Sequence, residues 1–150
     1  MKLKQLFIAI LLLFPLGVSS QILDPISWTT ATEITGESEV TLIATATIDE
    51  GWHLYAQQIP EDGPIPTSFV FKSSSEYLKK GNTKEETGIE LDDPVFKMRL
   101  KYFENQATFK QRIKRKLKTA FKVNAIVEFM VCNETQCLPP KEMDLIFEIN

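Results

Sequence analysis

The sequence contains few of the residues that define several common classes of protein. Its 150 residues include only two cysteines and one histidine. Two cysteines cannot build a disulfide scaffold, so the core has to come from packing, to which ten phenylalanines and two tryptophans contribute. Two cysteines and one histidine also give little basis for a zinc site, which takes four protein ligands or three and a water. We therefore expect no metal and no cofactor.

The chain also has no excess of positive charge. The chain has 17 basic and 20 acidic residues, a net charge of −3, and this balance does not point to a nucleic-acid partner. The basic residues nevertheless gather in one stretch, which carries Lys110, Arg112, Lys114, Arg115, Lys116, Lys118 and Lys122. The solvated face of a strand is the simplest interpretation. A docking surface for an acidic partner is the alternative.

Long apolar runs are absent after the first twenty residues. Residues 6–16 form a nearly continuous apolar run that follows two lysines and precedes a small-residue site ending at Ser20. This run is shorter than the about 20 residues that span a bilayer, and its flanks are those of a cleaved secretory signal peptide. We predict a signal peptide over residues 1–20 and one domain over residues 21–150. The mature chain is then periplasmic or secreted and has no membrane span.

The mature chain has the pattern of a β protein. Residues 39–49 are the clearest strand, because apolar side chains alternate there with threonines. Further strands are expected at residues 26–31, 52–56, 67–72, 94–103, 106–113, 120–131 and 143–149. Residues 73–93 are polar and show no clear period. Eight or nine short strands without an amphipathic helix predict an all-β, antiparallel β-sandwich.

Cys132 and Cys137 flank a polar turn of four residues between two apolar runs. Cysteines that face each other across such a hairpin lie at disulfide distance. A closed loop of about six residues stabilises a fold by only roughly 2 kcal/mol, and strained bridges are the exchangeable ones. Spacing alone leaves a structural bridge and a redox-active pair equally open. A thioredoxin-type site is not indicated, because that site needs Cys-x-x-Cys at a helix start.

His53 is the only histidine and lies between Trp52 and Tyr55. A partly buried structural histidine is the simplest interpretation. In the alternative, His53 or Tyr55 lies near the cysteines and helps to move a proton during thiol exchange. The spacing does not decide between the two.

Three segments occur in an order that resembles a known family. They are Glu50-Gly51-Trp52-His53-Leu54-Tyr55, Asp92-Asp93-Pro94-Val95-Phe96, and Val131-Cys132 through Cys137-Leu138-Pro139-Pro140. Together they resemble the N-terminal periplasmic domain of the thiol:disulfide interchange protein DsbD. The resemblance covers residues 26–149, and its most specific part is the Cys-x-Pro-Pro end of the hairpin.

The resemblance implies an immunoglobulin-like sandwich in which Cys132 and Cys137 cycle between dithiol and disulfide. In that family the domain takes electrons from a thioredoxin-like domain and passes them to oxidised periplasmic proteins, including disulfide isomerases and cytochrome c maturation factors. A cap loop with an aromatic residue covers the pair until a partner docks. Asp93 and Phe96 fall in the stretch that resembles this cap. Tyr55 falls in the strand beneath the site.

Two features depart from the family pattern. Four residues rather than five separate the cysteines, so the turn geometry and the reduction potential are expected to differ. The chain also ends at Asn150, without the family's membrane electron-transfer and thioredoxin-like domains. We expect a free-standing thiol:disulfide oxidoreductase of the protein-disulfide reductase type, fed by a separate reductant. The alternative is a non-catalytic secreted β-sandwich that binds a partner and keeps a structural disulfide.

Overall fold

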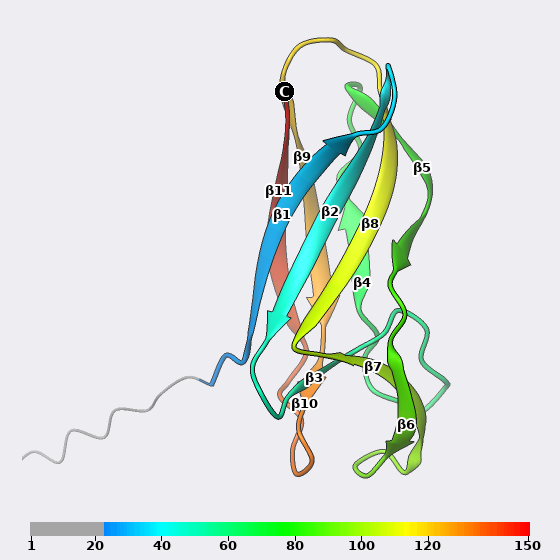
Figure 1. The fold of residues 1–150 in the computed structure, drawn as a ribbon, viewed down its shortest axis with the longest axis vertical. Helices are drawn as coiled ribbons and strands as arrows, with labels where there is room; N and C mark the ends of the chain where they lie inside the picture. Colours follow the sequence, from blue (N-terminus) through cyan, green and yellow to red (C-terminus); the bar gives the residue numbers. More distant parts are fainter. Residues whose placement is uncertain (1–22) are drawn as a thin grey trace, which may run out of the picture.

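A computed structural model of the protein describes residues 23–150 (Figure 1). Every regular element in this range is a β-strand. The predicted signal peptide over residues 1–20 lies outside the described residues. Between residues 23 and 150, no helix has the length and apolar character needed to cross a membrane.

Two antiparallel sheets make up the sandwich. The first has the order β1-β2-β8-β5 and consists of β1 (Ile26–Ile34), β2 (Glu39–Ile48), β8 (Gln106–Arg115) and β5 (Tyr77–Glu85). The second has the order β11-β9-β4 and consists of β11 (Lys141–Ile149), β9 (Phe121–Phe129) and β4 (Ser68–Phe71). All pairings are antiparallel. The predicted all-β, antiparallel sandwich is confirmed.

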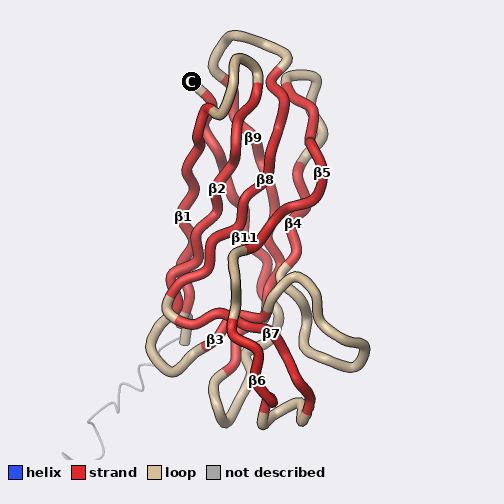
Figure 2. The backbone as a smooth tube through the Cα atoms, turned by 45° about the vertical axis from the view of Figure 1, so that its right-hand side comes forward, coloured by secondary structure: helices blue, strands red, loops and turns tan. Residues whose placement is uncertain are grey.

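A third and smaller sheet lies at one end of the sandwich, as Figure 2 shows. Its order is β10-β3-β7-β6, with β10 (Val131–Cys132), β3 (His53–Tyr55), β7 (Met98–Glu104) and β6 (Ile89–Asp93). Only Asn105, in the left-handed region at φ 61°, separates β7 from β8. Only Met130 separates β9 from β10. The long strands therefore carry the cysteine-bearing sheet directly, without flexible connections.

The core forms where the alternating strands of the two large sheets face each other. In β2 the residues Val40, Leu42, Ala44, Ala46 and Ile48 are buried, and in β9 the residues Phe121, Val123, Ala125, Val127 and Phe129 are buried. Trp28 joins the two layers, because its ring lies 5.7 Å from Phe109 on its own sheet and 5.5 Å from Phe129 on the other, between centroids. Aromatic packing of this kind buries large apolar areas and fixes how the layers lie.

The structure also contains strands that the sequence pattern did not predict. The unassigned stretch 73–93 holds β5 and β6, which are edge strands with mostly exposed side chains. A strand without a buried face has no period of two to detect. The strand expected at residues 94–103 begins only at Met98, because residues 94–97 form a turn that ends with Lys97 at φ 55°.

Candidate functional site

The two cysteines form a disulfide at the tip of the small sheet. They face each other as an isolated antiparallel bridge with their Cα atoms 4.0 Å apart, slightly closer than the usual 4.4–6.8 Å. Cys132 is fully buried, whereas Cys137 is partly exposed. Solvent or a docking partner therefore reaches the Cys137 side of the bridge first.

Asn133 shapes the turn between the cysteines. Its side-chain oxygen Oδ1 accepts hydrogen bonds from the backbone N–H of Thr135 at 3.0 Å and of Gln136 at 2.9 Å, and from the Thr135 hydroxyl at 3.0 Å. The Asn133 N–H also donates to the Gln136 carbonyl at 2.9 Å. This Asx-type turn closes a four-residue connection that would otherwise leave its backbone groups unpaired. No role for Asn133 was predicted from the sequence, although asparagine is a favoured residue at the start of such a turn.

His53 lies on the strand next to the disulfide. In the ladder between β3 and β10, His53 is directly opposite Cys132 and Leu54 is opposite Val131. The His53 ring is largely buried and packs against the ring of Tyr102 of β7, tilted by 35°, with centroids 4.5 Å apart. The histidine is therefore part of the cysteine site, which the sequence spacing alone could not decide.

A chain of polar contacts connects His53 through Tyr55 to Asp93. The Tyr55 hydroxyl donates to the Asp93 carboxylate at 2.7 Å, between oxygen and Oδ2. His53 Nε2 lies 3.2 Å from the Tyr55 oxygen and 3.6 Å from Asp93 Oδ2. Because Tyr55 gives its only hydroxyl hydrogen to Asp93, its oxygen is left as an acceptor, which assigns a hydrogen to His53 Nε2.

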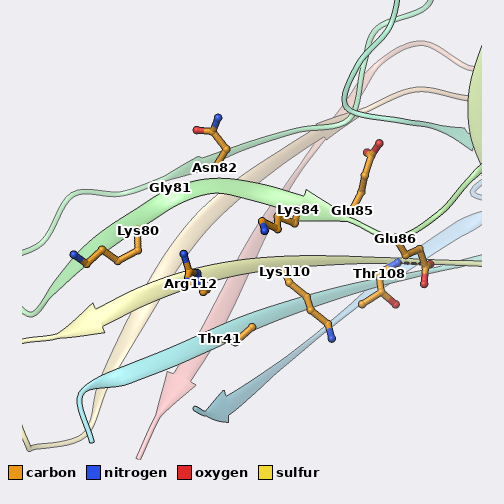
Figure 3. Close-up of a pocket in the computed structure, with 10 residues that line it drawn as sticks. All are labelled: Thr41, Lys80, Gly81, Asn82, Lys84, Glu85, Glu86, Thr108, Lys110 and Arg112. Carbon is orange, nitrogen blue, oxygen red and sulfur yellow. Dashed lines mark hydrogen bonds between the residues drawn. The ribbon is translucent and has the colours of Figure 1, made fainter. Parts of the chain in front are cut away.

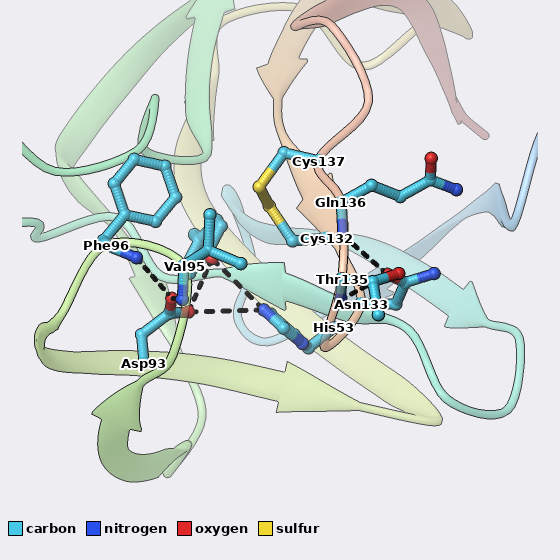
Figure 4. Close-up of a disulfide and its surroundings, with 10 residues drawn as sticks. His53, Asp93, Val95, Phe96, Cys132, Asn133, Thr135, Gln136 and Cys137 are labelled. Atoms are coloured by element: carbon cyan, nitrogen blue, oxygen red, sulfur yellow. Dashed lines mark hydrogen bonds and ion pairs between the residues drawn. A yellow bond between two sulfur atoms is a disulfide. The ribbon is translucent and has the colours of Figure 1, made fainter.

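Asp93 also holds the turn formed by residues 94–97, here called the cap turn. Its second carboxylate oxygen, Oδ1, accepts hydrogen bonds from the backbone N–H of Val95 at 2.8 Å and of Phe96 at 2.9 Å. The Lys97 N–H donates to the Asp93 carbonyl at 2.8 Å. Figure 4 shows the cap turn beside the hairpin that carries the disulfide. One buried carboxylate thus fixes the turn that positions Phe96.

Phe96 shares its packing with the cysteines. Its ring meets Tyr55 edge-on, with centroids 5.9 Å apart. Phe96 and Cys137 both pack, partly buried, against one cluster, whose buried members are Tyr55, Leu100, Tyr102 and Cys132. The Tyr55 strand is held in turn by Thr67, whose hydroxyl donates to the Tyr55 carbonyl at 2.6 Å. The cap turn and the disulfide therefore pack against the same buried cluster.

The buried groups of the site differ in charge. Burial lowers the pKa of His53 below 6.5 and outweighs the opposite effects of Asp93 and Glu104. For Asp93, burial acts to raise the pKa, but the hydrogen bonds from Phe96, Tyr55 and Val95 and the nearby His53 outweigh it, so the pKa lies below 3.8. Burial and the bond to Asp93 raise the pKa of Tyr55. At neutral pH the site therefore holds an anionic Asp93 beside neutral His53 and Tyr55.

A hollow of about 730 Å³ opens between the cap turn and the cysteine turn. It is lined by Gly51, His53, Leu91, Asp92, Asp93, Pro94, Tyr102, Glu104, Asn133, Glu134 and Thr135. Four of these residues are acidic, so the hollow has a negative potential. Across residues 23–150, no group of three or more histidine, cysteine or carboxylate side chains is placed to hold a metal ion.

The comparison with protein families decides where this arrangement belongs. The family model described as the N-terminal domain of the thiol:disulfide interchange protein DsbD matches residues 22–147. The chain belongs to this family. The family resemblance inferred from the sequence is confirmed, and no match was found among curated protein sequences.

Solved structures of DsbD N-terminal domains share the fold. The reduced form of the Neisseria meningitidis domain has 14% identity and a TM-score of 0.52, covering 81% of this chain and 85% of that one. The complex of the DsbD and PilB N-terminal domains from the same organism has 14% identity and a TM-score of 0.54, covering 84% of this chain and 87% of that one. The N-terminal periplasmic domain of ScsB from Proteus mirabilis has 13% identity and a TM-score of 0.54, covering 81% of this chain and 44% of that one. At such identities the likeness shows the fold alone, which is the predicted immunoglobulin-like sandwich.

The DsbD-type fold brings all the predicted site residues to one end of the molecule. They are Cys132, Cys137, His53, Tyr55, Asp93 and Phe96. The sequence did not predict the roles of Tyr102, whose ring packs against His53, or of Thr67, which anchors the Tyr55 strand. Tyr102 lies in an alternating run, where it could be read only as a core residue.

Proposed function

We propose that the domain exchanges its Cys132–Cys137 disulfide with thioredoxin-like partners and passes the electrons on to oxidised client proteins. One observation carries the proposal. A member of the DsbD N-terminal family holds a disulfide whose Cys137 side is partly exposed, beside a turn that a single carboxylate keeps in place. The predicted signal peptide would deliver the domain to the periplasm or outside the cell, where disulfides persist.

Reduction begins when a partner thiolate attacks the sulfur of Cys137. The Sγ–Sγ bond breaks, its electron pair goes to Cys132, and that sulfur leaves and takes up a proton. The second thiol of the partner then attacks the partner's own sulfur in the mixed disulfide, and Cys137 leaves as a thiolate that takes up the released proton. The partner ends as a disulfide and the domain ends as a dithiol, with two electrons transferred.

Oxidation runs in the other direction. The thiolate of Cys137 attacks the disulfide of an oxidised client and forms a new mixed disulfide. Cys132 then attacks Cys137, which reforms the bridge and releases the client as a dithiol. Cys132 suits this resolving role because it is buried next to its partner sulfur and does not meet other proteins.

The charges around the pair favour a slow, partner-dependent thiol. Anionic Asp93 lies in the same site, and a nearby negative charge raises the pKa of a thiol. Fewer thiolates at neutral pH would limit attack on unrelated disulfides. Docking of a partner, which has to displace Phe96 from its place beside the cluster, would then trigger the reaction.

Trapping of mixed disulfides tests the proposal. The Cys132→Ser and Cys137→Ser variants are each mixed with a thioredoxin-like protein that has one active-site cysteine. The cysteine that remains in each variant is first converted to its thionitrobenzoate disulfide, which releases a coloured thiolate when it is attacked. Cys132→Ser should form the protein–protein disulfide rapidly and Cys137→Ser slowly. If only Cys137→Ser reacts, the assignment of the attacked sulfur is wrong, and if neither variant reacts, the proposed interchange is wrong.

A further inference from the structure

A second hollow lies on the sandwich, outside the small sheet that carries the cysteines. A groove of about 620 Å³ runs over the outer face of the β1-β2-β8-β5 sheet (Figure 3). It is lined by Thr41, Lys80, Gly81, Asn82, Lys84, Glu85, Glu86, Thr108, Lys110 and Arg112. The side chains of Lys110 and Arg112 point outward, because they alternate along β8 with the buried Phe109, Gln111 and Ile113.

A bulge in the edge strand β5 shapes this groove. The register with β8 shifts between Lys80, which is opposite Arg112, and Lys84, which is opposite Lys110. Gly81 adopts φ 66° within the bulge, a conformation that glycine takes without strain. The bulge is therefore a local departure from regular pairing at the point where the basic residues meet.

One buried side chain is dedicated to holding the bulge. Gln111 is 1% exposed. Its Nε2 donates to the carbonyls of Lys80 at 3.0 Å and Arg112 at 2.8 Å, and its Oε1 accepts from the Thr83 hydroxyl at 3.0 Å. A buried amide with its hydrogen bonds satisfied rigidifies its surroundings. The groove is thus a fixed feature of the fold.

The four basic side chains of the groove form two cross-strand pairs of like charge. Lys80 is directly opposite Arg112, and Lys84 is directly opposite Lys110. Like charges in such cross-strand pairs destabilise a sheet. Within residues 23–150, none of these four cations makes an ion pair, whereas Lys101, Lys122 and Lys141 each have an acidic partner.

Two acids also line the groove, and each accepts hydrogen bonds from residues of the fold. Glu85 binds Lys101 Nζ through Oε1 at 2.8 Å and accepts the Gln57 N–H through Oε2 at 2.8 Å. Glu86 accepts the Thr108 N–H through Oε1 at 2.8 Å. Four cations against these two acids leave the groove with a net positive charge, on a protein that is acidic overall. This charge complements an acidic ligand.

The spacing of the cations points to the kind of ligand. Lys110 and Arg112 are two residues apart on β8. Each forms a row with the lysine opposite it on β5, and the two rows are about 6.8 Å apart. An extended peptide places the side chains of residues i and i+2 at this same distance and on the same side. We propose that the groove binds an extended acidic segment of a partner protein, with Asp or Glu at alternate positions and one carboxylate against each cationic row.

Binding of synthetic peptides tests this proposal without requiring exchange at the cysteines. The disulfide form is titrated into a fluorescein-labelled peptide in which glutamate alternates with serine. A second peptide has the same composition with its glutamates in one block. Fluorescence anisotropy should show saturable binding of the alternating peptide, weaker binding of the blocked one, and a Kd that rises with salt.

Matched variants locate the site. Lys110→Gln with Arg112→Gln should raise the Kd of the alternating peptide about tenfold, since two charge contacts are lost. Lys116→Gln with Lys118→Gln removes the same charge from the connection between β8 and β9 and should leave the Kd unchanged. Lys80→Gln with Lys84→Gln serves as a second groove variant if the first does not fold.

The proposal is wrong if no saturable binding is seen, if the groove and control variants lose affinity equally, or if the two peptides bind with equal affinity. Binding of tripolyphosphate that the alternating peptide cannot displace would likewise reject a peptide site in favour of a small-anion site. Thermal unfolding adds a separate check, because Lys110→Gln relieves a like-charge pair and should raise the Tm.

Discussion

His53 and Cys132 lie directly opposite each other in the ladder that joins β3 and β10. From His53, polar contacts lead to Tyr55 and then to Asp93, which holds the backbone of Phe96. A substitution at any of these residues is therefore expected to alter the packing both at the disulfide and at the cap turn.

The stability of the protein should fall as the pH drops below about 6.5, because of His53. Burial lowers its folded-state pKa, so the unfolded chain binds the proton more readily. The stabilising contribution is complete above about pH 6.5 and is lost as the pH falls through the folded-state pKa. His53 is the only histidine, which makes the assignment direct. Urea unfolding of the disulfide form between about pH 7 and pH 5 should show the loss.

His53→Gln provides the comparison for this titration. The variant removes the titrating ring and should flatten the dependence of the unfolding free energy on pH in that range. It also removes the ring contact with Tyr102, which should lower stability by a similar amount at every pH. An unchanged slope in the variant would mean that another group is responsible.

Replacement of Asp93 by Asn should destabilise the fold. The carboxylate accepts bonds from Val95, Phe96 and Tyr55, and loss of charge-assisted bonds at a buried site costs about 1–3 kcal/mol. Because the folded-state pKa of Asp93 is lowered, this stabilisation is present above about pH 3.8 and is lost as the pH falls through the folded-state value. The difference from wild type should therefore shrink in acid.

Asp92 supplies the matched control for Asp93. It is the preceding residue on β6, carries the same charge and is exposed. Asp92→Asn should leave the unfolding free energy within about 0.5 kcal/mol of wild type. Equal destabilisation in both variants would show that the charge of the β6 end, rather than the bonds of Asp93, sets the stability.

Truncation of Phe96 should expose the disulfide to small reductants. Phe96→Ala removes a ring that packs on the same cluster as Cys137. The rate of reduction by dithiothreitol, followed by thiol release, should increase severalfold. Val95→Ala changes the neighbouring cap-turn residue, which is 40% exposed, and should react like wild type. Identical rates for the three proteins would argue against Phe96 as a cover.

The reduction potential separates exchange from a purely structural bridge. Equilibration with thiol–disulfide buffers should place the pair above about −300 mV, the region of exchangeable disulfides. The loop that it closes is small, so reduction should change the unfolding free energy by no more than roughly 2 kcal/mol. A potential well below that value, together with a large fall in Tm on reduction, would favour the secreted binding module with a structural disulfide.

Alternation along the chain was enough to predict β2 and β9, because each buries one face over many consecutive residues and so repeats with a period of two. The order of short motifs, above all the Cys-x-Pro-Pro hairpin, was enough to identify the family. Both signals are local, or depend only on order along the chain. They do not require knowledge of which strands are neighbours.

Only the tertiary structure decided what surrounds the disulfide. The pairing of β3 with β10 places His53 opposite Cys132, and the return of β6 beside β7 delivers Asp93 to Tyr55. The groove depends on the shifted register of β5, an edge strand with no alternating pattern. Contacts of this kind arise from strand pairing between distant segments, and hydrophobic periodicity, which reports burial within one segment, carries no information about them.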